Sequence, residues 1–138
     1  MAGSGGTLTR GIRSLGRADL EVLLTRRPEG AAAIASHGQS PTVALLASAL
    51  AGRSGVRRAV ESLDQFLLQL VRVAAWMGSE VAGGDLEAQA AGVDPADLRA
   101  AAGELARWGL AFPHEAPGAS GGWGLWVPGA VRAEVPPA

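Results

Sequence analysis

The chain has 138 residues, of which 48% are apolar and 18% charged, a composition that supports one globular domain with its own core. It contains neither cysteine nor lysine, which excludes disulfides, thiolate catalysis, cysteine-ligated metals, a P-loop lysine and Schiff-base chemistry. The net charge of −1 hides an asymmetry, because residues 1–60 carry eight arginines and three carboxylates (+5) and residues 61–138 carry four arginines and ten carboxylates (−6).

A helical segment is expected over residues 7–63, after a flexible N-terminus at 1–6. Capping residues and the spacing of apolar side chains predict its helices. One helix is expected to begin at Thr7, and a second to run over about 17–27. A third is expected from Ser40 to Gly52, and a fourth to begin at Ser54. The stretch 28–40, which begins at the proline that stops the second helix, is expected to be loop-like, although AAAIA could form a turn.

Residues 64–132 are expected to form a winged helix that packs with the first segment as one unit, followed by a flexible tail at 133–138. Asp64 is the predicted cap of an apolar helix over 65–77, and a short helix follows over about 83–91. This order of helices, continued by a capped helix and a hairpin, is the winged-helix arrangement.

The helix over residues 94–108 is the best specified in the chain. Asp94 is its predicted cap and Pro95 suits its first turn. At its other end Gly109 suits a left-handed residue, with Leu110 folding back onto the helix.

A hairpin is expected after this helix. Its strands are predicted at 110–112 and 123–127, and between them lies the turn-rich tip HEAPGASGG at 114–122. The fold class that follows is mainly α, with N-terminal helices leading into a winged helix whose wing is a two-stranded β-hairpin.

Four stretches of the sequence carry a resemblance to a known family. They are DLEVLLTRRPEG at 19–30, RRAVESLDQFLLQLV at 57–71, VDPADLRAAAGELARWGLA at 93–111 and WGLWVPGAVR at 123–132. In these stretches the chain resembles the N-terminal winged-helix region of XPB-type helicase-associated domain proteins of high-GC Gram-positive bacteria. The resemblance implies a DNA-repair context without a motor, because 138 residues do not hold an ATPase core.

Arginines are the candidates for nucleic-acid binding. A groove-reading helix usually presents several Arg, Lys, Asn or Gln side chains, whereas the helix over 94–108 offers two arginines opposed by Asp97 and Glu104. Phosphate contacts need only positive charge within reach, but a basic half can equally meet the acidic half of its own fold, and most charge clusters are solvated helix faces. The candidates are Arg53, Arg57, Arg58, Arg99 and Arg107, with the stripe of Arg10, Arg13 and Arg17 as a second set.

Two of the tryptophans are candidates for a contact surface. Alternation along the last strand puts Trp123 and Trp126 on opposite faces, so one of the two is expected to be more exposed. An exposed tryptophan on a wing is more typical of a protein contact than of a base-stacking platform. Trp123 and Trp126 are therefore the candidate protein-contact residues, and Trp76 and Trp108 are expected to pack at the edge of the core.

Catalytic and metal-binding chemistry finds little support in the sequence. His37 and His114 are its two histidines, both expected in loops, and no HxxxH or HExxH spacing occurs. Hydrolytic triads need a histidine beside a nucleophile and a carboxylate, which the sequence does not indicate. We therefore expect no enzyme activity, no catalytic residue, no metal and no cofactor.

The function expected from the sequence is a non-catalytic interaction module of a helicase-like, DNA-transaction protein, with weak phosphate-backbone binding as a further property. The alternative is a winged-helix DNA-binding transcriptional regulator. The expected partner is another protein or the remainder of a longer helicase-like chain, with DNA as a second candidate. The apolar stretch 66–77 is about half the length needed to span a bilayer, so no membrane association is expected and the location should be cytoplasmic.

Overall fold

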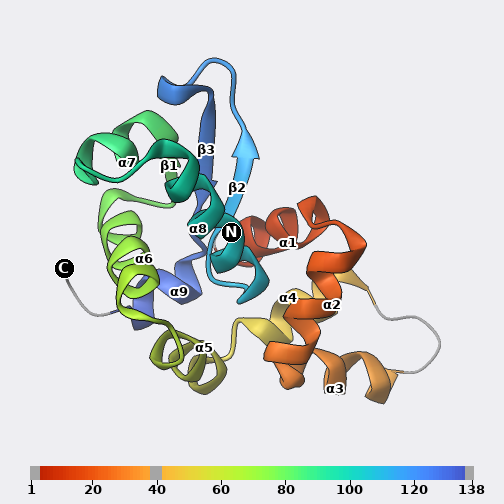
Figure 1. The fold of residues 1–138 in the computed structure, drawn as a ribbon. Coiled ribbons are helices and arrows are strands. Elements are labelled where there is room, and N and C mark those ends of the chain that lie inside the picture. Colours follow the sequence, from red (N-terminus) through yellow and green to blue (C-terminus); the bar gives the residue numbers. More distant parts are fainter. Residues whose placement is uncertain (1–3, 38–41, 136–138) are drawn as a thin grey trace.

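Figure 1 shows the computed structural model, which describes residues 4–37 and 42–135. Over these residues the chain is mainly helical, with 69% helix in nine α-helices, and a three-stranded antiparallel sheet lies near the C-terminus. The mainly α class predicted from the sequence is confirmed. No helix in the described part of the chain is both long and apolar enough to span a bilayer.

Four helices form the first part of the described chain. They are α1 (Ser4–Ser14), α2 (Arg17–Arg26), α3 (Pro28–His37) and α4 (Val43–Leu50). α1 begins at Ser4 rather than at the predicted Thr7, so it includes residues that were expected to be flexible. Apolar side chains of α1, α2 and α4 form a shared core, which includes Leu8, Ile12, Leu23, Leu46, Ala47 and Leu50.

The loop expected over 28–40 is wrong for residues 28–37, which form α3. Its first residue, Pro28, has no N–H, and a helix leaves the N–H groups of its first turn without an internal partner. The alanines that follow are the strongest helix formers. Gly30 then allows α3 to pack against α4, because a Cβ at this position would press against Leu46.

Two helix starts differ from those expected. The predicted start at Ser40 lies outside the described residues, and α4 is capped by Thr42, whose side chain accepts a hydrogen bond from the backbone N–H of Leu45 (3.1 Å). α5 (Arg53–Glu61) follows a glycine that provides no side-chain cap, so the predicted cap at Ser54 is wrong.

The next helix confirms its predicted boundary. α6 (Gln65–Met77) begins after Asp64, whose side chain accepts a hydrogen bond from the backbone N–H of Leu67 (2.8 Å). α7 (Gly83–Gln89) and α8 (Pro95–Arg107) then follow within the predicted stretches.

Both ends of α8 are also confirmed. Asp94 caps it by accepting a hydrogen bond from the backbone N–H of Ala96 (2.8 Å). Gly109 adopts the left-handed conformation, with φ at 71°. The next N–H, that of Leu110, donates to the carbonyl of Leu105 (3.1 Å), which closes the helix end.

The predicted two-stranded hairpin is present as an antiparallel pair, and the sheet has a third strand that was not predicted, in the order β1-β3-β2. The strands are β1 (Glu80–Ala82), β2 (Phe112–Glu115) and β3 (Trp123–Trp126), and both outer strands run antiparallel to β3. β1 pairs Val81 with Leu125. A strand of three residues is too short to carry an alternating pattern, so the sequence did not reveal it.

Two further boundaries moved. β2 begins at Phe112, later than the predicted strand at 110–112, since the N–H of Leu110 is already bonded to α8. A last helix, α9 (Gly129–Glu134), reaches into the predicted flexible tail, and a short 3₁₀ turn, η1 (Ser120–Gly122), precedes β3.

Two apolar clusters meet along α8 and the sheet. The larger one is formed mainly by α5 to α9 and β3, and the smaller one by the N-terminal helices together with Ala106 of α8 and Phe112 of β2. Gly11 of α1 lies against the ring of Phe112, so closely that a Cβ there would overlap it. The N-terminal helices and the sheet are therefore directly packed in this structure.

Candidate interaction surfaces

The C-terminal half of α8 is joined to α2 by a network of ion pairs. Arg107 donates from Nε to Asp19 of α2 (2.9 Å) and from Nη1 to Glu104 of its own helix (3.0 Å). Glu104 also pairs with Arg26 of α2 (2.7 Å), and the Arg26 guanidinium lies over the ring of Trp108. Hydrogen bonds to Asp19, and then to Glu104, raise the pKa of Arg107 above its ordinary value. Arg107 is thus engaged within the fold.

The N-terminal half of α8 offers few hydrogen-bond donors to a ligand. Its one arginine, Arg99, pairs with Glu115 of β2 at 3.5 Å and lies over the ring of Trp123 at 5.3 Å. The remaining exposed side chains of this half are small or acidic, namely Pro95, Ala96, Asp97 and Ala100.

The arginines of α5 are held by α9. Arg53 donates to one carboxylate oxygen of Glu134 (2.9 Å) and Arg57 to the other (3.0 Å). The Glu134 side chain is only 6% exposed, and the hydrogen bonds from Arg57, and then Arg53, lower its pKa below the ordinary glutamate value. Arg58 is exposed and forms no ion pair within the described ranges.

We expect Glu134→Gln to remove a stabilising contribution that depends on pH. Because the pKa of Glu134 is lowered on folding, its pairs with Arg53 and Arg57 stabilise the fold above the ordinary glutamate pKa and are lost as the pH falls through the lower folded value. Urea unfolding at a series of pH values should therefore give the wild type a larger free energy of unfolding than Glu134→Gln at pH 7. This difference should disappear as the pH is lowered to 3. Glu61→Gln, an exposed carboxylate of α5, is the control and should show no such closing difference.

The five predicted arginines do not converge on one surface. Arg53 and Arg57 share Glu134 of α9, and Arg58 lies beside them on α5. Arg99 contacts the sheet, whereas Arg107 contacts α2. The arrangement brings together only the α5 arginines, and two of those three share the single negative charge of Glu134.

The two tryptophans of β3 occupy opposite faces, as predicted. Trp123 is 1% exposed and donates from Nε1 to Glu87 of α7 (3.1 Å), so it lies inside the fold and not on a contact surface. Trp126 is partly exposed and stacks on His114 at 3.9 Å between ring centroids. The Arg10 guanidinium also lies over Trp126, at 5.2 Å.

The two histidines lie in regular structure, not in the predicted loops. His114 is on β2, with its Nε2 3.6 Å from Glu80, and His37 is the last residue of α3. Among the residues that the structure describes, no three His, Asp or Glu side chains gather as metal ligands would.

Sequence reasoning missed a buried arginine at the junction of the N-terminal helices and α8. Arg27 is 2% exposed and donates three hydrogen bonds, to the carboxylate of Glu29 (2.7 Å) and to the carbonyls of Leu50 (2.8 Å) and Trp108 (2.9 Å). In the helix predicted over about 17–27, Arg27 lies four residues after Leu23 and therefore on the same face, which was a readable signal. In the structure it is the residue that follows the end of α2.

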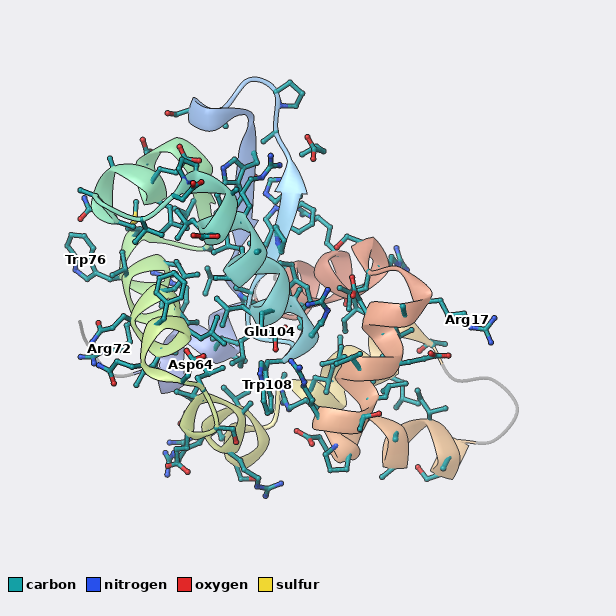
Figure 2. The ribbon with its side chains drawn as sticks, in the orientation of Figure 1. Arg17, Asp64, Arg72, Trp76, Glu104 and Trp108 are labelled. Atoms are coloured by element: carbon teal, nitrogen blue, oxygen red, sulfur yellow. The ribbon has the colours of Figure 1, made fainter. Side chains whose placement is uncertain are left out.

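Sequence reasoning also missed an apolar groove of about 160 Å³ between α6, α7 and α8. Its lining comprises Phe66, Gln69, Leu70 and Val73 of α6, Leu86, Gln89 and Ala90 of α7, and Leu98 of α8. Phe66 is 43% exposed, and Trp76 on the same helix is 71% exposed, so the expected core-edge packing of Trp76 is wrong. Figure 2 shows Trp76 pointing away from the ribbon at one end of α6, with Asp64 at the other.

A signal for this surface was present in the sequence. An amphipathic helix packed on a core needs one apolar stripe, and the rest of its surface is usually polar. α6 buries Leu67, Leu70, Val71, Ala74 and Ala75, yet it also carries large apolar side chains outside that stripe. A helix that is apolar on more than one side indicates a second contact.

Comparison of the chain with protein-family models, with curated proteins and with solved structures finds no match.

Proposed function

We propose that the chain is a winged-helix module that acts by binding another protein in a helicase-like, DNA-transaction context and not by reading a DNA sequence. The observation that carries this proposal is the ion-pair network that joins α2 to the C-terminal half of α8. Asp19 and Arg26 of α2 occupy the side of α8 that carries Glu104 and Arg107.

The winged-helix assignment is supported by the order of elements. α6, β1, α7, α8, β2 and β3 follow one another along the chain, and the hairpin strand β3 lies between β1 and β2 in the sheet. In this arrangement α8 is the counterpart of the recognition helix, the second helix of a helix-turn-helix pair, which DNA-binding proteins insert into the major groove.

Sequence reading by α8 is disfavoured by the state of its side chains. Bidentate contacts to base edges need free Arg, Lys, Asn or Gln donors. Arg107 already donates to two carboxylates, and Arg99 pairs with Glu115. The α8 side chains that remain exposed include Asp97, which would repel a phosphate backbone.

Protein binding is favoured by the apolar groove beside α6. Two large hydrophobic side chains, Phe66 and Trp76, are exposed on this helix, and aromatic side chains are enriched at protein interfaces. The DNA-transaction context rests on the family resemblance of the sequence. The exposed arginines, such as Arg13 and Arg58, support at most a weak contact with phosphates.

Fluorescence anisotropy with labelled duplex DNA tests the proposal. We expect weak binding at about 50 mM salt that does not depend on DNA sequence and falls roughly 3- to 12-fold at about 200 mM, as one or two phosphate contacts would give. Arg58→Ala should weaken it further, whereas Arg107→Ala should leave it unchanged because Arg107 already donates to Asp19 and Glu104.

The opposite result would support the transcriptional-regulator alternative. It would consist of binding that persists at about 200 mM salt, discriminates between duplex sequences, and is lost in Arg99→Ala or Arg107→Ala. Binding through Arg107 would require α2 to release this side chain, and with either arginine the proposed function would be abandoned.

A further inference from the structure

We propose that the groove between α6, α7 and α8 docks a basic amphipathic helix of another protein. The inference rests on the proposed function and names the chemistry of the partner. Three properties of the described residues carry it: the exposed stripe on α6, the charge of the surrounding elements, and the lack of a suitable occupant on the chain itself.

Three exposed side chains of α6 and the half-buried Val73 form a stripe along the helix axis. Phe66, Gln69, Val73 and Trp76 are spaced by three or four residues, so they lie along one side of the helix. At 1.5 Å per residue the stripe is about 15 Å long, or roughly three turns. A stripe of this length with three apolar side chains and one glutamine, beside a groove, is a surface that an amphipathic helix fits with residues at i, i+3, i+4 and i+7.

The elements around the groove are strongly acidic. Residues 64–98 carry six carboxylates and one arginine, a net charge of −5. Asp64 and Asp94 cap the helices that line the groove, and Asp85 and Asp97 directly precede the lining residues Leu86 and Leu98. These four carboxylates are exposed, and none forms an ion pair within residues 4–37 and 42–135. Their field attracts a cationic partner.

A second copy of the chain fits this surface poorly. A two-fold contact through α6 would bring two sectors of net charge −5 together. A head-to-tail contact would need a large exposed apolar side chain elsewhere, and Phe66 and Trp76 are the large hydrophobic residues exposed in the described part of the chain. The same negative charge disfavours an anionic membrane surface. The partner that remains is a helix of another protein that carries lysine or arginine beside its apolar face.

A displayed library of random 20-residue peptides provides the test. Selection is carried out on the wild type and, in parallel, on Trp76→Ala, which should fold normally because Trp76 is 71% exposed. Circular dichroism and urea unfolding check that the two proteins are equally folded. We expect the peptides enriched on the wild type to carry apolar residues at helical spacing and a net positive charge.

One enriched peptide then measures the contribution of each feature. Trp76→Ala should weaken its binding about 30-fold, the loss typical of an aromatic hot-spot residue of an interface. The exposed Gln65 provides a matched charge pair on the same helix: Gln65→Lys should weaken binding and Gln65→Glu should strengthen it, with both differences shrinking in high salt. Arg17→Ala, 92% exposed on α2, is the distant control and should change nothing.

Four outcomes would overturn the inference, and they are distinguishable from failure of the proposed function. Peptides that bind the wild type and Trp76→Ala equally would place the contact elsewhere and leave a protein-binding module intact. Self-association in sedimentation that Trp76→Ala abolishes would identify a second copy as the occupant. Binding to phosphatidylglycerol vesicles that Trp76→Ala abolishes would identify a membrane. No enriched peptide at all would remove the groove as a docking site, and only salt-resistant, sequence-dependent DNA binding would also remove the proposed function.

Discussion

Arg27→Met should lower the free energy of unfolding by about 3 kcal/mol, toward the lower end of the range for breaking a buried ion pair. Arg27 is 2% exposed and supplies hydrogen bonds to Glu29 and to the carbonyls of Leu50 and Trp108. Methionine fills similar space but donates nothing, so all three acceptors would lose their partner. The lower end applies because the Glu29 side chain is 26% exposed and can be hydrated.

Urea unfolding of matched variants measures this loss. Arg17→Met is the control, because Arg17 is 92% exposed and its pair with Glu21 spans 3.5 Å, an arrangement worth at most a few tenths of a kcal/mol. Arg27→Met combined with Glu29→Leu should recover part of the stability, since no unpaired carboxylate remains. If Arg27→Met lowers the free energy of unfolding by less than about 1 kcal/mol, Arg27 does not stabilise the contact between the N-terminal helices and α8 as the structure indicates.

Trp123→Ala should have a comparable or larger effect, about 3–5 kcal/mol, which is typical of removing a buried aromatic side chain. Trp123 is 1% exposed, and its indole N–H bonds Glu87 of α7. Gly83 at the start of α7 lies so close to the indole that it has no room for a Cβ. Loss of the ring would therefore leave a cavity between the sheet and α7 and an unpaired acceptor.

The tryptophans of the same chain provide graded controls for this prediction. Trp126→Ala should cost less, because Trp126 is only partly buried and contacts His114 and Arg10 at the surface of the sheet. Trp76→Ala should be close to neutral, because its side chain is 71% exposed. Thermal or urea unfolding that ranks the three variants differently would contradict the burial order of the structure.

Ion pairs between the basic and the acidic half of the chain balance part of the charge asymmetry of the sequence. Arg26, Arg53 and Arg57 of the basic half pair with Glu104 and Glu134 of the acidic half. What remains unpaired is uneven, because the exposed carboxylates around α6 to α8 have no arginine partner among the described residues. The resulting negative surface lies beside the exposed apolar groove, which is why we expect a basic partner at this place.

The sequence by itself determined the features whose partners lie within a few residues along the chain. Asp64 and Asp94 were recognised as helix caps because a cap bonds a backbone N–H only two or three residues away. Gly109 was recognised as a helix end because its left-handed conformation depends on the glycine itself. The opposite faces of Trp123 and Trp126 followed from the two-residue period of a strand.

Only the tertiary structure decided which side chains meet across the chain. Arg107 resembled a candidate for DNA in the sequence, but Asp19, 88 residues away, engages it. Arg27 became structural because the ends of α4 and α8 present carbonyls to it. Phe66 and Trp76 became a candidate docking surface because no described element covers that side of α6. Such pairings depend on how helices pack against one another, and local spacing carries no information about that packing.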